Sequence, residues 1–193
     1  MKKILIMIYM FIFHPMLFWK YTIRDSSRYF LANGNMQNIK TRNMIIGRRV
    51  RVGNFTRINF YDSGMLKIGN GCYIGQRNTF LVGEDIIIGD NVLMASDICI
   101  SSENHGTDPM DPKGYAGQSL RLAPVTIGDG CWIGEKVIIL SGVKIGEKSI
   151  IGAGSVVTKN IPSYCIAVGN PAKVIKKYDL ENNSWVSVRS NEE

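Results

Sequence analysis

His105 is the residue of this chain best suited to acid–base chemistry. It is one of two histidines among 193 residues, and it immediately precedes a stretch rich in Gly, Pro and Asp, residues 106–124. A neutral imidazole can take a proton from a hydroxyl group near neutral pH while the hydroxyl oxygen attacks an electrophile. A lone histidine is more often an ordinary surface residue, so the case for catalysis depends on what surrounds it.

The net charge indicates an anionic partner. The chain has 23 Lys and Arg against 16 Asp and Glu, a formal net charge of +7. Nucleic acid, an anionic membrane surface or a phosphorylated cofactor would fit such a charge. No nucleic-acid-binding motif is present, and the aromatic residues do not interleave with a basic stripe, so we expect no nucleic acid partner.

The cysteines do not predict a metal site. Four of them stand far apart without a C-x-x-C pair, whereas a zinc site needs closer spacing. Two occupy small-residue positions of the repeat described next, which predicts buried, reduced thiols and a cytoplasmic location. The four are Cys72, Cys99, Cys131 and Cys165, and the two in the repeat are Cys72 and Cys131.

From Ile127 the sequence repeats every six residues. The hexads are IGDGCW, IGEKVI, ILSGVK, IGEKSI, IGAGSV and VTKNIP, each opening on an aliphatic residue with a small or β-branched residue at position five. A period of six fits neither an α-helix nor an ordinary strand, but it fits a short strand followed by a turn. The same phase recurs upstream at Ile46, Val52, Ile68, Ile74, Ile88, Met94 and Ile100.

The repeat predicts a solenoid over about residues 45–162, in which stacked strands bury a continuous aliphatic column. The phase slips between Ile58 and Ile68 and again at Phe80–Leu81, which predicts loops or bulges at corners. The largest interruption, residues 106–124, is too long and irregular for a core, so we expect a protruding loop. Long loops on rigid scaffolds often carry function.

This pattern resembles the hexapeptide-repeat acyltransferases, whose left-handed parallel β-helix has three hexads per coil. The left hand is implied by the family alone, because parallel crossovers are usually right-handed. The implied all-β organisation is an apolar N-terminal helical segment and lead-in (1–44), a β-helix with the loop 106–124 and a CoA-binding end (45–177), and a short tail (178–193). For the tail, a short helix and a frayed end both remain open.

The segments around His105 are most similar to those of the maltose, galactoside and polysaccharide O-acetyltransferases of this family. They are NHGTDPMDP and APVTIGDGCWIG. The resemblance implies that His105 is the general base and that a hydroxyl attacks the thioester directly, with a backbone N–H near Gly134–Glu135 as the oxyanion donor. Many polysaccharide-modifying relatives carry Asp three residues before the histidine; Ser102 stands there, beside Glu103, so what orients His105 is open.

The segment GAGSVVTKNIP, followed by AVGNPAKVIKK, resembles the family's acetyl-CoA segment. The resemblance implies that Lys173 and Lys176 meet the CoA phosphates, with a solvated basic tail as the alternative. For Trp132, ordinary packing is an equal alternative to a channel wall. The residues implied to line the cofactor channel between two subunits are Ala95, Trp132, Gly134, Ala153, Thr158 and Lys159.

Asn78 falls near the family's asparagine that positions the sugar hydroxyl, although a corner asparagine can equally be a turn residue. Glu84 and Asp85 share this ambiguity. A channel between subunits would leave a single chain with half a site, so the resemblance implies a homotrimer with three sites.

Near the start of residues 1–19, two lysines precede an apolar run, Ile4–Phe13, and Pro15 follows where a membrane-spanning helix would have to continue. The run is short for a membrane span, and no small-residue cleavage site follows. A helix at the cytoplasmic membrane face and a helix packed on the protein body remain equally open.

The leading hypothesis is an acetyl-CoA-dependent O-acetyltransferase acting on a sugar hydroxyl in O-antigen or capsule biosynthesis, without a metal. N-acetylation of a nucleotide-linked amino sugar or a small xenobiotic is the enzymatic alternative, and a structural β-helix is the non-enzymatic one. The zinc carbonic anhydrases share the β-helix but need three histidines; this chain has only His14 and His105.

Overall fold

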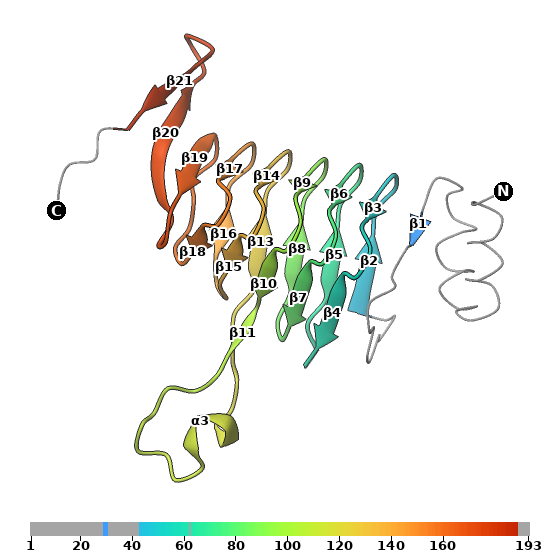
Figure 1. The fold of residues 1–193 in the computed structure, drawn as a ribbon, viewed down its shortest axis with the longest axis vertical. Helices are drawn as coiled ribbons and strands as arrows, with labels where there is room; N and C mark the ends of the chain where they lie inside the picture. Colours follow the sequence, from blue (N-terminus) through green and yellow to red (C-terminus); the bar gives the residue numbers. More distant parts are fainter. Residues whose placement is uncertain (1–28, 31–42, 62, 189–193) are drawn as a thin grey trace.

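The computed structural model describes residues 29–30, 43–61 and 63–188, which form a parallel β-solenoid (Figure 1). Each coil contributes one short strand to each of three sheets. Sheet A contains β1 (Tyr29–Phe30), β3 (Arg51–Val52), β6 (Tyr73–Ile74), β9 (Leu93–Met94), β14 (Trp132–Ile133), β17 (Ile150–Ile151), β19 (Cys165–Val168), β20 (Lys173–Asp179) and β21 (Ser184–Ser187).

The other two sheets have five strands each, so the solenoid has five full coils. Sheet B contains β2 (Met44–Ile46), β5 (Leu66–Ile68), β8 (Ile86–Ile88), β13 (Val125–Ile127) and β16 (Lys144–Ile145). Sheet C contains β4 (Arg57–Phe60), β7 (Thr79–Val82), β10 (Cys99–Ser101), β15 (Ile138–Ile139) and β18 (Val156–Val157). The chain passes from B to A to C and back to B, and we name the corners B/A, A/C and C/B accordingly.

The core is the aliphatic column that the six-residue period predicts. The residues that open the hexads of the later coils, such as Ile133, Ile139 and Ile145, are 0% exposed. Their neighbours in the strands point outward, so each two-residue strand has one exposed or half-buried and one buried side chain. Stacking closes every gap along the column, and this burial stabilises short strands that could not persist alone.

The phase slips all lie at the C/B corner, as the prediction of loops at corners requires. The spacing between successive inward residues grows from six to ten between Ile58 and Ile68, to eight between Phe80 and Ile88, and to 27 between Ile100 and Ile127. Phe80 itself stays in the column, 0% exposed and paired with Ile100. The inserted residues therefore leave the column undisturbed and enlarge one corner only.

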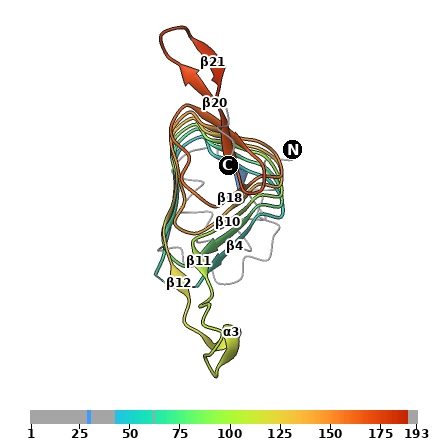
Figure 2. The ribbon, with the colours of Figure 1, turned by 90° about the vertical axis from the view of Figure 1, so that its left-hand side faces the viewer.

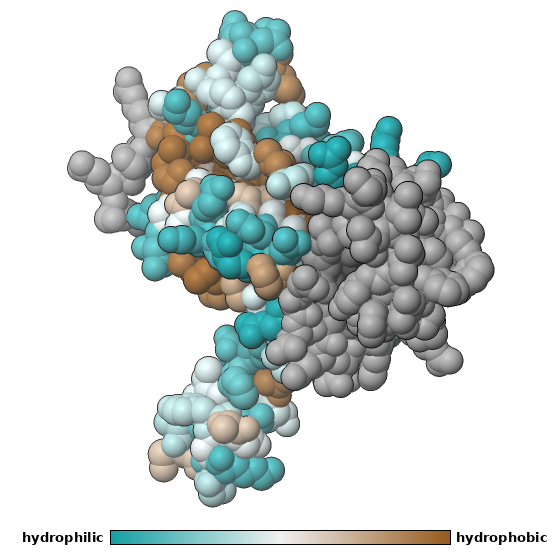
Figure 3. All heavy atoms as spheres, turned by 45° about the vertical axis from the view of Figure 1, so that its right-hand side comes forward, coloured by the Kyte–Doolittle hydropathy of each residue, from teal (hydrophilic) through white to brown (hydrophobic). Residues whose placement is uncertain are grey.

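The largest insertion is the protruding loop. A two-stranded antiparallel ladder, β11 (Glu103–Asn104) with β12 (Arg121–Leu122), forms its base, and the short helix α3 (Gly114–Gly117) lies near its tip. Figure 2 views the solenoid roughly along its axis and shows the loop extending from one corner, on the side opposite the C-terminal strands. The loop surface in Figure 3 is mainly hydrophilic, whereas hydrophobic residues are exposed on the coils.

The C-terminal residues differ from the expected short helix or frayed end. β20 turns back antiparallel on β19, and β21 pairs with β20 to form a hairpin. The rings of Tyr178 and Trp185, which are cross-strand partners, meet edge to face with centroids 5.1 Å apart. This aromatic contact stabilises the hairpin beyond the last complete coil, at least as far as Ser187.

The expected N-terminal helix lies outside the described residues. Of residues 1–42, the structure describes only β1, which pairs in parallel with β3 at the end of the solenoid. Within the described part of the chain, no helix is long and apolar enough to cross a membrane.

Candidate active site

His105 lies at the C/B corner of the third coil, directly after β11 and at the root of the protruding loop. Its side chain is exposed, and its backbone N–H donates to the Oδ1 of Asn104 at 2.9 Å. The ring has no hydrogen-bond partner among the described residues of the chain. The imidazole is therefore presented to solvent, open to a ligand or to another copy of the chain.

Ser102, three residues before His105, is a structural residue. It is 0% exposed, and its Oγ accepts hydrogen bonds from the backbone N–H groups of Gly83 (3.1 Å) and Glu84 (3.2 Å). The same Oγ lies 2.6 Å from the carbonyl oxygen of Glu84, to which its hydroxyl donates. Ser102 thus fixes the loop root to the previous coil and has no contact with the His105 ring.

Gln118 closes the loop behind His105, although no motif in the sequence indicated this role. Its Nε2 donates to the carbonyl oxygen of Asp108 at 2.8 Å, and its Oε1 accepts from the Asp108 N–H at 3.1 Å. A Cβ added at Gly106 would come within 2.8 Å of the Gln118 Cβ, so the close approach of the two loop segments requires glycine there. This clamp orders the residues that directly follow His105.

Thr158 and Lys159 share the C/B corner with His105. Both are exposed and follow β18, which lies two strands along sheet C from β10. At the usual strand spacing, this places them about 10 Å from the His105 corner along the solenoid axis. Two of the expected cofactor residues therefore lie on the same edge as the expected base.

The other expected cofactor residues lie along the A/C corner. Ala95, Gly134 and Ala153 follow strands of sheet A in three successive coils. A Cβ at Gly134 would come within 2.6 Å of the Ala153 nitrogen, so only glycine permits the coils to stack there. Lys173 begins β20 near the same corner, because the adjacent Ala172 N–H donates to the Val156 carbonyl oxygen at 2.9 Å.

The oxyanion donor expected near Gly134–Glu135 is not the Gly134 N–H. This N–H donates to the carbonyl oxygen of Ile151 at 2.9 Å, as part of the ladder that joins neighbouring coils. A backbone donor committed to that ladder is unavailable to a developing negative charge. Glu135 contributes its carbonyl oxygen to Gly154, and its own N–H has no acceptor among the described residues.

Trp132 lies on the outer face of sheet A. It is 50% exposed, and its strand register aligns it with Leu93, which is 44% exposed, and through Leu93 with Tyr73, which is 49% exposed. Ordinary packing within the chain does not account for this row, because half of each large side chain remains in contact with solvent. Lys176 lies further along the same sheet, opposite Ile166.

The expected site residues thus fall into two groups at opposite edges of sheet C. One group is His105, Thr158 and Lys159, and the other follows the A/C corner. Six residues of extended chain separate Gly134 from Leu140, a span of roughly 20 Å at most. Because the stacked coils fix both corners, the two groups cannot close onto each other within one chain.

Asn78 is part of the scaffold in this structure. Its side chain is 0% exposed; its Nδ2 donates to the carbonyl oxygens of Gly75 (2.9 Å) and Ala95 (3.0 Å). Its Oδ1 accepts from the Ile98 N–H at 2.8 Å. With these amide hydrogen bonds made to backbone inside the solenoid, the geometry agrees with the turn-residue alternative and disagrees with contact to a sugar hydroxyl.

Two comparisons identify the family. A family model described as bacterial transferase hexapeptide (six repeats) matches residues 124–159. Over 135 residues, 67% of this chain, the sequence is 33% identical to a putative lipopolysaccharide biosynthesis O-acetyl transferase of Escherichia coli K12, and the match covers 69% of that protein. The chain belongs to the hexapeptide-repeat transferase family.

Other family members extend the comparison. The chain is 38% identical over 120 residues to the galactoside O-acetyltransferase of Escherichia coli K12, covering 62% of this chain and 58% of that protein. A solved mutant of the N-acyltransferase AntD from Bacillus cereus, in complex with dTDP and coenzyme A, has a TM-score of 0.60 at 24% identity, covering 79% of this chain and 90% of that one. This likeness confirms the predicted fold, a left-handed parallel β-helix.

The chain spans only 45–61% of the length of several curated relatives that it matches. The family is therefore established over the β-helix, which contains both groups of site residues.

The thiols of this hexapeptide-repeat protein are structural. All four cysteines are free, and Cys72, Cys131 and Cys165 are buried, as the repeat predicts for the first two. Burial is the main cause that raises the pKa of each thiol, and it raises the pKa of Cys131 to about 11. Within the described residues, no group of three or more His, Cys, Asp or Glu side chains could hold a metal ion.

Proposed function

We propose that this protein is an acetyl-CoA-dependent O-acetyltransferase acting on a sugar hydroxyl in cell-surface polysaccharide biosynthesis. The observation that carries the proposal is the exposed His105 at the root of the clamped loop, on the same corner as Thr158 and Lys159. A general base must be accessible to the proton it removes, and the donor must bind nearby.

The reaction would proceed by direct transfer. The His105 imidazole takes the proton of the sugar hydroxyl while the hydroxyl oxygen forms a bond to the thioester carbonyl carbon. The tetrahedral intermediate then collapses, the carbon–sulfur bond breaks, and the imidazolium returns its proton to the departing CoA thiolate. The thioester is already activated, so no covalent acyl-enzyme is needed.

The site would be completed by a second copy of the chain. The A/C group of one subunit, with Trp132 and Gly134, would face the C/B group of its neighbour, with His105. The exposed side chains of Leu93 and Trp132 support such a contact, because a partner would cover them. A cyclic trimer would pair the two groups three times with one kind of interface.

The acetyl donor would lie between the subunits. Ala95, Ala153 and Trp132 would line the pantetheine arm, and Lys173 with Lys176 would meet the CoA phosphates. The AntD structures bind coenzyme A or an acyl-CoA, which supports a CoA donor for this chain as well.

The polysaccharide acceptor is supported by the relative involved in lipopolysaccharide biosynthesis. It also fits the apolar residues 1–19, since a helix at the cytoplasmic membrane face would bring the enzyme to lipid-linked glycans. A variant lacking residues 1–19 should then leave the membrane fraction; if it sediments with membranes as before, the interfacial-helix proposal fails.

The experiment that tests the function is acetyl-CoA turnover against paired acceptors. Each pair would contain a sugar with a free hydroxyl and the same sugar with an amine at that position, both free and lipid-linked. Faster CoA release with the hydroxyl acceptor supports O-acetylation. Preference for the amine would replace it with N-acetylation, and absence of turnover with every acceptor would favour a structural β-helix.

A further inference from the structure

The B/A corner of the first three coils stacks three residues in the same left-handed conformation. Arg49, Gly71 and Asn91 occupy the same position in successive coils, each with positive φ (55°, 70° and 55°). Backbone hydrogen bonds fix the stack: the Gly71 N–H donates to the Arg48 carbonyl oxygen at 2.8 Å, and Asn91 repeats this contact one coil further at 2.7 Å. Gly71 has no side chain, and the side-chain oxygen of Asn91 lies where its Cβ would be.

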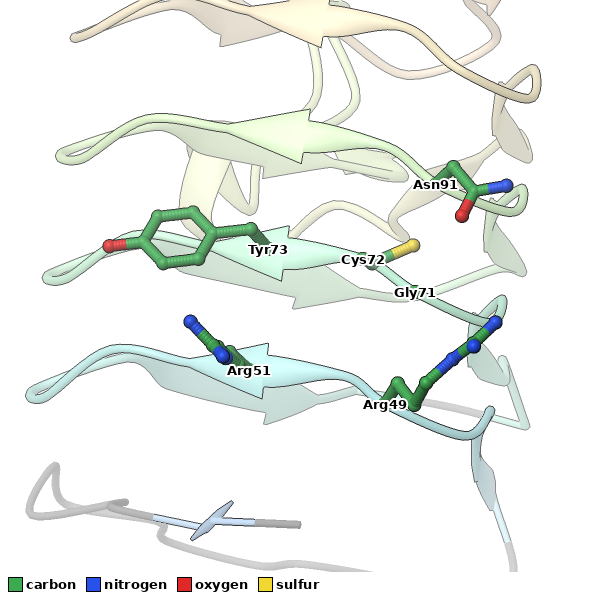
Figure 4. A pocket seen from close by; sticks show the side chains of 6 residues that line it. All are labelled: Arg49, Arg51, Gly71, Cys72, Tyr73 and Asn91. Atoms are coloured by element: carbon green, nitrogen blue, oxygen red, sulfur yellow. The ribbon is translucent and has the colours of Figure 1, made fainter. Parts of the chain in front are cut away.

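A cavity of about 610 Å³ lies beside this stack. Figure 4 shows Arg49 and Arg51 rising from the first coil toward the coil above, with Arg51 below the ring of Tyr73 and Arg49 beside the turn. A Cβ at Gly71 would fall on the Oδ1 of Asn91, so a side chain there would displace the Asn91 amide. The residues that line the cavity are Arg49, Arg51, Gly71, Cys72, Tyr73 and Asn91.

The cavity is lined by two arginines and by no carboxylate. The carboxylates of Asp90 and Asp129, which help to raise the pKa of the lining Cys72 thiol, lie outside its lining. Residues 43–61, the first coil, contain four arginines and no Asp or Glu. Neither Arg49 nor Arg51 has an ion-pair or hydrogen-bond partner for its guanidinium among the described residues. By contrast, the exposed Arg77 in the next coil is paired with Asp97 at 2.7 Å. Two unpaired guanidinium groups at a concave surface favour binding of an anion.

The spacing of the two arginines selects the kind of anion. They are separated by one residue, so their Cα atoms lie about 7 Å apart along the strand. In Figure 4 the two guanidinium groups point away from each other, Arg51 below Tyr73 and Arg49 toward the corner. A single phosphate could engage one of them well, whereas a diphosphate can place charge near both. The Tyr73 hydroxyl and the Asn91 amide add neutral donors at the same surface.

We propose that this cavity binds a diphosphate group, such as the diphosphate that links a sugar to a nucleotide or to a polyprenyl lipid. The site lies on the B/A corner and sheet A, whereas His105 lies on the C/B corner, so it is a second site and does not depend on the acetyl-transfer proposal. A volume of about 610 Å³ also leaves room for part of the group attached to the diphosphate.

Binding of inorganic pyrophosphate to the full chain, measured by titration calorimetry, tests the site. Pyrophosphate should bind more tightly than inorganic phosphate, and Arg49→Ala or Arg51→Ala should each weaken it at least about tenfold. Arg51→Lys should weaken it less, because the charge remains while the planar fork is lost. Gly71→Asn should also weaken binding, since its side chain would displace the Asn91 amide while both arginines remain.

Lys67→Ala is the matched control, because Lys67 is an exposed cation of the second coil on a different face, sheet B. It should change the affinity by less than about twofold. Farnesyl diphosphate and UDP are then titrated separately. Tighter binding of farnesyl diphosphate indicates a lipid-linked diphosphate as the ligand, and tighter binding of UDP indicates a nucleotide diphosphate. Either preference supports the site if the Arg49→Ala and Arg51→Ala substitutions abolish it.

Two results would overturn the proposal. One is no pyrophosphate binding at about 1 mM ligand. The other is binding that survives both arginine substitutions and disappears in Lys173→Ala with Lys176→Ala, because the anion would then occupy the proposed CoA phosphate site.

Discussion

The side-chain amide of Asn78 donates a hydrogen bond to the carbonyl oxygen of Ala95, 3.0 Å away in the next coil of the β-helix. Together with its bonds to Gly75 and Ile98, this contact joins two coils at a position without solvent access. Asn78 therefore holds the scaffold beneath Ala95, one of the proposed cofactor-channel residues.

Asn78→Ala should lower the free energy of unfolding by about 2–4 kcal/mol, because buried backbone groups lose their partners. Denaturant unfolding measures this, and the KM for the acceptor should stay within about twofold. Asn54→Ala is the control, an exposed asparagine without a side-chain hydrogen bond in the described chain, and should change stability by less than about 0.5 kcal/mol. A stable Asn78→Ala protein with a strongly raised acceptor KM would restore the substrate-binding interpretation.

Cys131 should make stability depend on alkaline pH. It is 1% exposed, its Sγ donates to the Gly146 carbonyl oxygen at 3.0 Å, and burial raises its thiol pKa to about 11 from the ordinary 9.0. The folded state therefore holds this proton more tightly than the unfolded state. The stabilisation is complete below pH 9 and is lost as pH rises through about 11, a decrease of about 2–3 kcal/mol.

Cys131→Ser is the matched variant for this measurement, because serine keeps the donor to Gly146 and does not titrate in this range. Unfolding of the variant should show a shallower decline between pH 9 and 11 than the parent chain. Identical slopes for the two proteins would show that Cys131 does not cause the pH dependence.

Lys173→Ala combined with Lys176→Ala should lower the affinity for CoA by about tenfold or more, because charge-assisted contacts to phosphate are lost. Affinity for dephospho-CoA should fall less, since that ligand lacks one of the phosphates. Calorimetric titration with both ligands measures the difference. Equal losses for the two ligands would contradict the phosphate role of these lysines.

A site shared between subunits predicts complementation. His105→Ala removes one half of the site, and Ala153→Arg, at an exposed position of the A/C corner, should block the other half. Each variant alone should be inactive. Unfolded together at equal amounts and refolded, they should recover about a quarter of parental activity, the fraction of interfaces with two intact halves. No recovery in properly mixed oligomers would indicate that each site lies within one chain.

The sequence was informative wherever spacing alone determines structure. Six-residue recurrence of residues such as Ile133 and Ile139 predicts the column, because only stacked short strands bury that pattern. The break after His105 likewise predicted the loop. The sequence was uninformative about contacts between segments that meet only in the folded chain. The Gln118–Asp108 clamp and the Ser102 contacts are of this kind.

Two expectations changed for the same reason. The oxyanion donor was expected near Gly134–Glu135, but the Gly134 N–H belongs to the ladder to Ile151, which leaves the Glu135 N–H as the candidate. The tail after Lys177 was expected to be helical or frayed, but the pairing of Tyr178 with Trp185 produces a hairpin. In both cases the partner lies in a neighbouring strand, and one-dimensional patterns of type and spacing do not identify it.

The most direct test of the central claim is the rate of acetyl transfer by His105→Ala at saturating acetyl-CoA, measured beside CoA affinity. With His105 as the general base, kcat should fall by about 10²–10⁴-fold while the Kd for CoA stays within about twofold. Undiminished turnover of the variant with intact CoA binding would contradict the account.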